Sequence, residues 1–251
     1  MNTVYRKEYS TALSRDMEYK IYGFAGIPFL VFPSQDGRFF DYENNGMIEA
    51  AKPFIESGRI QMFCADSNDR NSWSSQNTDG RKRTEAQEAY YRYITEELCP
   101  RIIEFSRQSN EGYYAGGIYT TGCSMGASHA LNFLLRRPDL FRGCIALSGA
   151  YNMHYFFGDY NDDLLYANSP VNYIEGMAYD HPFVEMYRSR RIIMCAGQGA
   201  WEHPMLEDLK RMKELFEYKD VPAWADIWGT DVAHDWSWWQ KQLPYFLDHI
   251  S

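Results

Sequence analysis

The sequence predicts an α/β fold in which a mostly parallel central sheet carries helices on both faces. Two observations lead to this prediction. First, short apolar runs at 27–32 and 144–147 are typical of strands buried on both faces, and residues 118–121 form a β-prone run. Second, segments between them carry apolar residues at the three- and four-residue spacing of amphipathic helices. Alternating strands and helices form right-handed βαβ units, so one sheet between two helical layers is expected.

The composition is that of an ordinary globular domain. A chain of 251 residues is long enough to bury a sizeable core, and its 45% hydrophobic and 24% charged residues argue against disorder. The net charge is −9, and no basic cluster exceeds Arg81-Lys82-Arg83. Nucleic acid and anionic membranes are therefore not expected as partners.

The first eight residues and the five cysteines indicate in which cellular compartment the protein is expected. Residues 1–8 lack the apolar core of a signal peptide, and no run approaches membrane-spanning length. The five cysteines form no CxxC pair and mostly lie in apolar runs, which is typical of buried thiols in a reducing compartment. A cytoplasmic protein is expected. No cluster has metal-ligand spacing, so neither a metal nor another cofactor is predicted. The oligomeric state stays open, and a homo-oligomer is one possibility.

The first quarter of the chain is predicted to contain a hairpin, two buried strands and a helix. Segments 4–10 and 17–24 read as an antiparallel pair joined by a polar turn around residues 14–16. Segments 27–32 and 60–65 read as buried strands. The helix between them is predicted from five apolar residues at helical spacing, with Gly58 as its stop: Met47, Ile48, Ala51, Phe54 and Ile55.

A long polar segment, 67–84, follows the second buried strand and has no period of its own. A loop of this length in a compact domain is usually functional or mobile, and Trp73 in its middle is not explained by loop solubility. From 85 to 106 the pattern is helical, and a kink is expected at Pro100 because proline cannot donate a backbone hydrogen bond.

The last hundred residues continue the alternation after an interruption. Strands are predicted at 144–149, 192–196 and 223–228, with a helix between the last two and a final helix from 235 towards 250. Segment 151–190 breaks the rhythm and is rich in aromatic and acidic residues. It reads either as a small aromatic-rich insertion that covers a pocket or as a helical elaboration packed on the edge of the sheet.

The strand at 118–121 leads directly into Gly122-Cys123-Ser124-Met125-Gly126, and helix-forming residues follow at once. Strand, Gly-x-Ser-x-Gly and helix in this order form the context of a nucleophile elbow. The serine must adopt a strained backbone conformation to expose its hydroxyl, and the two glycines let strand and helix approach closely. Ser124 is therefore the predicted nucleophile. The alternative is a tight turn whose glycines merely permit packing.

Partners for the serine are expected just after later strands, because chemistry in parallel sheets gathers at the carboxyl ends of the strands. Glu202 follows the strand at 192–196, and His234 follows the strand at 223–228. Asp231 remains an alternative acid. The order nucleophile, acid, histidine is the one that the α/β-hydrolase arrangement requires.

Four segments resemble the putative-esterase branch of the α/β-hydrolase fold, which is related to esterase D and to feruloyl esterases. They are residues 32–37, 122–126, 197–202 and 228–236. The resemblance extends over almost the whole chain, except 151–190, and implies a single α/β-hydrolase domain over residues 1–251. It also implies Ser124 as nucleophile and His234 as base, and it places the acid in the loop that contains Glu202.

These residues predict a serine carboxylic-ester hydrolase that works through an acyl-enzyme intermediate on a small-molecule ester. The histidine takes the proton of the serine, and the carboxylate fixes the imidazole tautomer. The backbone N–H of Met125 is expected to stabilise the oxyanion, with a second donor from Gln35 or Ser34. Two alternatives stay open: an acyltransferase with the same triad, and a catalytically silent binding module.

The substrate cannot be read from the sequence, although aromatic residues make up 17% of the chain. Four residues are expected to border the substrate: Trp73, Cys123, Trp201 and Trp236. Cys123 lies out of register for attack, so it is also read as a small buried filler. Trp236, Trp238 and Trp239 cannot share one helical face, so at least one of them is expected to face the site or a partner.

Of the other histidines, His129 in the helix after the elbow is read as a packed or capping residue. His154 and His181 lie in segment 151–190 and are expected at the surface, with lining of a pocket as the alternative. No sequence pattern assigns a role to His203 or His249.

Overall fold

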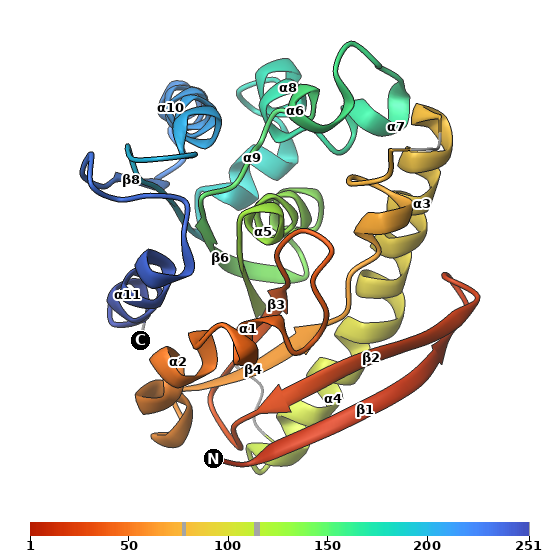
Figure 1. The fold of residues 1–251 in the computed structure, drawn as a ribbon, viewed down its shortest axis with the longest axis vertical. Helices are drawn as coiled ribbons and strands as arrows, with labels where there is room; N and C mark the ends of the chain where they lie inside the picture. Colours follow the sequence, from red (N-terminus) through yellow and green to blue (C-terminus); the bar gives the residue numbers. More distant parts are fainter. Residues whose placement is uncertain (77–78, 113–115, 251) are drawn as a thin grey trace.

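The computed structural model describes residues 1–76, 79–112 and 116–250, in which eight strands form one sheet (Figure 1). The strand order is β1-β2-β4-β3-β5-β6-β7-β8. The strands are β1 (Thr3–Ser10), β2 (Arg15–Tyr22), β3 (Ile27–Phe32), β4 (Ile60–Ala65), β5 (Ile118–Cys123), β6 (Phe141–Leu147), β7 (Arg191–Ala196) and β8 (Trp224–Ile227). The pairs β1–β2 and β2–β4 are antiparallel, and the other pairs are parallel. The predicted mostly parallel sheet and the predicted hairpin are confirmed.

Strand β3 is where the order of the sheet reverses. Its neighbours are β4 on one side and β5 on the other, and from β5 the chain continues through β6 and β7 to the edge strand β8. Ligands of open α/β sheets bind beyond the carboxyl ends of the strands at such a reversal, because the two flanking loops turn away from each other. The loops that follow β3 and β5 are therefore the expected walls of a site.

Helices cover both faces of the sheet. One face is covered by α1 (Asp41–Asn44), α2 (Met47–Glu56) and α11 (Trp236–Leu247). The other face is covered by α3 (Gly80–Arg92), α4 (Cys99–Ser109), α5 (Met125–Arg136), α8 (Pro170–Gly176), α9 (Pro182–Tyr187) and α10 (His203–Tyr218). Side chains alternate between the two faces along each strand, so Leu30 and Phe32 pack under α5 whereas Phe29 and Val31 pack under α2.

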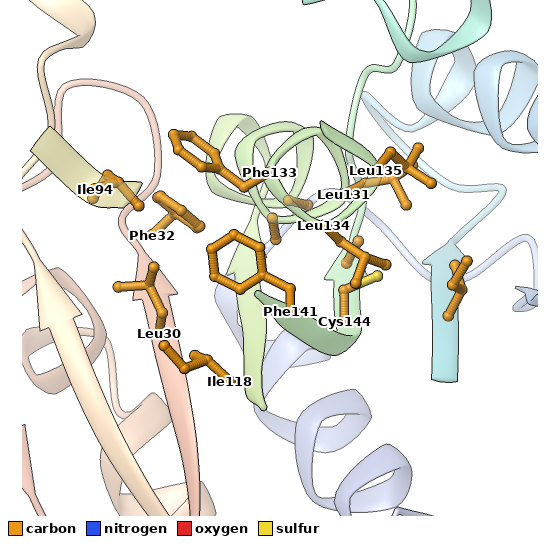
Figure 2. Close-up of a cluster of buried hydrophobic side chains, with 14 of the residues drawn as sticks. Leu30, Phe32, Ile94, Ile118, Leu131, Phe133, Leu134, Leu135, Phe141 and Cys144 are labelled. Atoms are coloured by element: carbon orange, nitrogen blue, oxygen red, sulfur yellow. The ribbon is translucent and has the colours of Figure 1, made fainter. Parts of the chain in front are cut away.

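Helix α5 lies in the middle of the larger core. Every residue from its start at Met125 to Leu135 is buried, as in a helix that is enclosed on all sides. Figure 2 shows Leu131, Phe133, Leu134 and Leu135 of α5 among side chains of the sheet: Leu30, Phe32, Ile118, Phe141 and Cys144. The rings of Phe32 and Phe133 stack with centroids 4.8 Å apart. Because α5 is held in place by this packing, the position of Ser124, which directly precedes it, is fixed as well.

The predicted helix at 85–106 begins earlier and is irregular before its proline. Helix α3 starts at Gly80, because the side chain of Asp79 accepts a hydrogen bond from the backbone N–H of Lys82. A π-helical stretch, η2 (Tyr93–Leu98), then joins α3 to α4, with Pro100 in the first turn of α4. The predicted loop at 67–84 is shorter than expected and contains a single 3₁₀ turn, η1 (Asp69–Asn71), among its described residues; residues 77–78 lie outside them.

Segment 151–190 forms four short helices between β6 and β7: α6 (His154–Phe157), α7 (Asp163–Tyr166), α8 and α9. Helices α8 and α9 contribute Val171, Ile174 and Val184 to the core beside α5. Residues of α6 instead belong to a small separate cluster with Trp73 and Met125. Within the ranges described above, we find no helix whose length and apolarity would let it cross a membrane.

Candidate active site

Ser124 occupies the sharp turn between β5 and α5. Its backbone has φ 57° and ψ −124°, a conformation that costs a non-glycine residue roughly 1–3 kcal/mol. Backbone hydrogen bonds hold the turn: the N–H of Ser124 donates to the carbonyl of Leu147 at 2.9 Å, and its own carbonyl accepts from Ala127 at 2.9 Å. The side chain therefore projects from a strained but well-supported position.

The two flanking glycines are required by close backbone contacts. A Cβ atom on Gly122 would lie 2.3 Å from the backbone of Gly126, and one on Gly126 would lie 2.4 Å from the carbonyl oxygen of Phe32. No side chain fits at either position, because real Cβ atoms do not approach backbone this closely. This is the steric condition that the Gly-x-Ser-x-Gly motif predicts.

His234 reaches Ser124 from the loop between β8 and α11. Its Nε2 atom lies 2.8 Å from the Oγ of Ser124, although the residues are 110 positions apart. The backbone N–H of His234 donates to the carbonyl of Ala200 at 2.9 Å. The edge of its ring meets the indole of Trp239, with centroids 4.9 Å apart and planes at 86°. The structure thus brings the predicted serine and histidine into hydrogen-bond contact.

Glu202 approaches the other side of the imidazole. Its fully buried side chain places Oε1 3.6 Å from Nδ1 of His234. The same oxygen accepts a hydrogen bond of 2.5 Å from the hydroxyl of Ser148, and that hydroxyl accepts one of 3.0 Å from Nε1 of Trp239. The alternative acid, Asp231, is exposed. Ser148 and Trp239 were not anticipated as neighbours of the acid, since they are far from it in the sequence.

The loop after β3 faces the start of α5. The backbone N–H and the hydroxyl of Ser34 both donate to Asp41 Oδ2, each at 2.9 Å. Gln35 borders the same cavity as Ser124 and Met125. Both donors of Ser34 are therefore used by Asp41, whereas Gln35 is the residue of this loop that borders the cavity beside Ser124.

A cavity of about 470 Å³ opens at this point. It is bordered by Gln35, Ser124, Met125, Ala150, Tyr155, Phe156, Trp201, His203, Pro204, Met205 and His234. Another cavity, of about 530 Å³, is lined by charged side chains such as Arg38 and Asp66, which bind each other. The smaller cavity is the candidate site because Ser124 and His234 lie on its wall.

Of the four residues expected to border the substrate, the structure places only Trp201 on this cavity, with its side chain 85% exposed. Trp73 is 1% exposed and stacks on His129. Cys123 points to the opposite face of the sheet, where its Sγ lies 3.4 Å from the hydroxyl of Tyr42 and burial raises the pKa of its thiol. Trp236 packs edge-on against Tyr42. As far as the structure describes the chain, these three are packing residues, and the expectation that they bind substrate is corrected.

Several cavity residues were missed. His203, Pro204 and Met205 form the first turn of α10, directly after Glu202, so the position of the acid was the available signal. Tyr155 and Phe156 come from segment 151–190, which was read either as an insertion that covers a pocket or as a helical elaboration on the edge of the sheet. The carbonyl of Phe156 accepts a 2.9 Å hydrogen bond from the guanidinium of Arg83, which ties this segment to α3.

The remaining histidines have mixed roles. His129 is buried in the core, as expected, and binds a buried carboxylate, Asp69, that the sequence did not single out. His154 is exposed, and the Nδ1 atom of His181 caps α9 by accepting from the N–H of Phe183.

A serine on an elbow, contacted by a histidine at the carboxyl edge of a mostly parallel sheet, is the arrangement of the α/β-hydrolase fold. Fold and family together define a carboxylesterase-type serine hydrolase. The model of the family described as "Putative esterase" matches residues 10–250, so the chain belongs to that family. Membership implies small-molecule ester substrates.

Three solved structures, of an esterase and two hydrolases, illustrate that the fold is shared over nearly the whole length of each chain. A ferulic acid esterase is 16% identical with a TM-score of 0.74, covering 100% of this chain and 99% of that one. Staphylococcus aureus FphF, a fluorophosphonate-binding serine hydrolase, is 11% identical with a TM-score of 0.69, covering 99% and 97%. An S-formylglutathione hydrolase from Agrobacterium tumefaciens is 13% identical with a TM-score of 0.68, covering 99% and 95%. No curated protein sequence matches the chain.

Proposed function

We propose that this protein hydrolyses carboxylic esters of small molecules through a Ser124-His234-Glu202 triad and an acyl-enzyme intermediate. The observation that carries the proposal is the 2.8 Å contact between His234 Nε2 and Ser124 Oγ. A serine hydroxyl is a weak nucleophile at neutral pH, so a base must take its proton as it attacks the ester carbonyl. At this distance His234 can do so directly.

The negative charge that develops on the carbonyl oxygen needs donors already in place. The backbone N–H of Met125, at the N-terminus of α5, is one such donor, and the positive end of the helix dipole supports it. The backbone N–H of Gln35 is the second, since Gln35 borders the cavity beside Met125. Loss of one donor in such a site typically lowers the rate by roughly 10²–10³-fold.

The proton then moves in two stages. Protonated His234 gives its Nε2 proton to the leaving alcohol as the bond between the acyl carbon and the alcohol oxygen breaks, leaving the acyl group on Ser124 Oγ. Water attacks the acyl carbon while His234 accepts a proton from it, and that proton returns to Ser124 Oγ when the acid departs. Glu202 stabilises the imidazolium in both stages, because its carboxylate lies beside Nδ1.

We further propose that the acyl group is aromatic and that part of segment 151–190 covers it. Tyr155 and Phe156 of this segment border the cavity together with Trp201, so a flat ring would meet aromatic side chains. The name of the ferulic acid esterase that shares the fold is consistent with an acyl group of this kind.

The test is turnover of a panel of p-nitrophenyl esters and methyl cinnamate by the parent and two variants. Ser124→Ala and His234→Ala should each lower kcat by roughly 10⁴–10⁶-fold, as in dissected triads. Retention of parent-like turnover by either variant would refute the triad. Product analysis with added alcohols separates hydrolysis from acyl transfer, because a transferase would form a new ester.

We also propose a cytoplasmic location. All five cysteines, each within the described part of the chain, are buried and free of disulfides, which suits a reducing compartment. Cell fractionation against a cytoplasmic marker tests this, and recovery of the protein outside that fraction would contradict it.

A further inference from the structure

The carboxylate of Asp69 is fully buried and binds two different parts of the structure. Oδ1 accepts a hydrogen bond from Nε2 of His129 at 2.9 Å. The other oxygen, Oδ2, accepts one from the backbone N–H of Asp36 at 3.2 Å. A buried carboxylate is costly unless it is paired and hydrogen-bonded, and these two contacts supply that pairing. Neither contact involves Ser124 or His234.

The first partner of Asp69 is the loop that carries Gln35. Asp36 has φ +59°, a conformation that residues other than glycine adopt only with support from their surroundings. That support comes from Asp69 at its N–H and from a hydrogen bond between its carboxylate and the hydroxyl of Ser74. On the other side of Gln35, Ser34 is fixed by Asp41. Carboxylates thus anchor both neighbours of the proposed oxyanion donor.

The second partner of Asp69 is the helix that carries the other donor. His129 lies in α5, five residues after Ser124, and its ring stacks on Trp73 with centroids 4.0 Å apart and planes at 10°. Trp73 in turn belongs to the buried cluster that contains Met125. One carboxylate therefore connects the loop of Gln35 to the helix whose first N–H is that of Met125.

We propose that Asp69 is a positioning residue that fixes the separation of the two oxyanion donors, Gln35 and Met125. The inference rests on the proposed function, and Asp69 itself contacts neither substrate nor reacting atoms. Preorganised donors contribute to catalysis only if they are already at the correct distance, and a displacement of about 1 Å can cost roughly 10²-fold in rate. The stacking of Trp73 on His129 supports the same arrangement, because Trp73 also packs in the cluster that contains Met125. This contact accounts for the burial of a tryptophan within the polar segment 67–84.

The test is the Asp69→Asn variant, because its amide keeps the shape of the side chain but has only one acceptor oxygen in place of the two that contact His129 and Asp36. We expect kcat to fall roughly 10–100-fold while KM changes less than about twofold, since only transition-state stabilisation is lost. The affinity for an aryl trifluoromethyl ketone, which forms an oxyanion on the serine, should fall by the same factor as kcat/KM. The pH dependence of kcat/KM should stay that of the parent, because the triad is untouched.

Glu88→Gln is the matched control. Glu88 also binds α5, through Arg136 at 2.8 Å, but at the end of the helix far from Ser124. The same change from carboxylate to amide should lower the melting temperature and leave kcat unchanged. A folded Asp69→Asn variant with parent kcat, or equal losses of kcat in both variants, would overturn the proposal.

Two further variants keep the outcome decisive. If Asp69→Asn does not fold, Ser74→Ala removes the other support of Asp36 at a half-exposed position. A lower kcat at unchanged KM then supports the proposal, and parent kcat overturns it. Ser124→Ala distinguishes failure of the proposed function from failure of the role of Asp69. An active Ser124→Ala variant refutes the proposed function. An inactive Ser124→Ala variant together with a fully active Asp69→Asn variant refutes only the role of Asp69.

Discussion

Oε1 of Glu202 lies 3.6 Å from Nδ1 of His234, just beyond hydrogen-bond range, and the same oxygen accepts a hydrogen bond of 2.5 Å from the hydroxyl of Ser148. Among the described residues, Glu202 Oε2 and His234 Nδ1 are both buried atoms with no hydrogen-bond partner. Unpaired polar atoms in the interior cost roughly 1–3 kcal/mol each. Pairing of the Glu202 carboxylate with the imidazolium that forms during the reaction would recover that energy.

The first prediction concerns the acid. Glu202→Gln should lower kcat by roughly 10²–10⁴-fold, because an amide cannot stabilise the imidazolium as a carboxylate does. Asp231→Asn is the control, since Asp231 is exposed, and should change kcat less than twofold by steady-state kinetics on a p-nitrophenyl ester. The opposite pattern, with Asp231→Asn inactive and Glu202→Gln active, would show that the acid is misassigned.

The second prediction concerns Ser148, which connects Glu202 to Trp239. Ser148→Ala should lower kcat about tenfold and destabilise the fold by roughly 1–3 kcal/mol, because the indole N–H loses its buried acceptor. Ser148 has φ +59°, so Ser148→Gly should lose the same activity but be about 1 kcal/mol more stable than the alanine variant. Urea unfolding and kinetics on both variants check this. Unequal activities of the two would mean that backbone strain, and not the lost hydroxyl, controls the rate.

The third prediction concerns the aromatic wall of the cavity. A double variant, Tyr155→Ala with Phe156→Ala, should raise KM for methyl cinnamate about tenfold or more, because contact with a buried aryl group is worth roughly 1.5–3 kcal/mol. KM for p-nitrophenyl acetate should change much less. Tyr166→Ala removes an exposed ring from the same segment and serves as control. Parallel changes for both substrates in the double variant would count against an aromatic acyl site.

The fourth prediction concerns pH and Asp162, which precedes α7. Burial opposes the ionisation of Asp162, but hydrogen bonds from the N–H of Leu165 and the hydroxyls of Tyr160 and Thr84 outweigh it and hold its pKa below the ordinary 3.8. A carboxyl whose pKa is lowered by folding stabilises the fold above its unfolded pKa, and this contribution is lost as the pH falls through its folded pKa.

Asp162→Asn should therefore be less stable than the parent at pH 6, and the difference in unfolding free energy should shrink as the pH falls below 3.8. Urea unfolding at a series of pH values measures it. A difference that stays constant down to the lowest pH at which both proteins fold would show that ionisation of Asp162 does not contribute.

The sheet and the elbow of Ser124 could be predicted because their signals are local, whereas His234 could be paired with Ser124 because it follows a later strand of the same sheet. The run at 27–32 is apolar on both faces, and the Gly-x-Ser-x-Gly motif between a strand and a helix is contained within a few residues of Ser124. The last helix begins where Asp235 caps it, since the side chain of Asp235 accepts a hydrogen bond from the N–H of Ser237. Such features depend on the backbone within one turn, so neighbouring residues reveal them.

The supports of the site could not be predicted, because they join residues that are far apart and individually ordinary. Ser148 meets Trp239 across 91 positions, and His129 meets Asp69 across 60. Trp73 drew attention as an aromatic residue in a polar segment, yet it packs on His129 and lies inside. Only the folded chain distinguishes a tryptophan that supports a site from one that lines it.

Covalent labelling by a fluorophosphonate tests the central claim most directly, since the reagent needs a serine activated by its base. The account predicts one adduct per chain, located by peptide mass spectrometry on the peptide that contains Ser124. It also predicts no adduct in Ser124→Ala and a much slower reaction in His234→Ala. Labelling of a different residue, or undiminished labelling of Ser124→Ala, would contradict it.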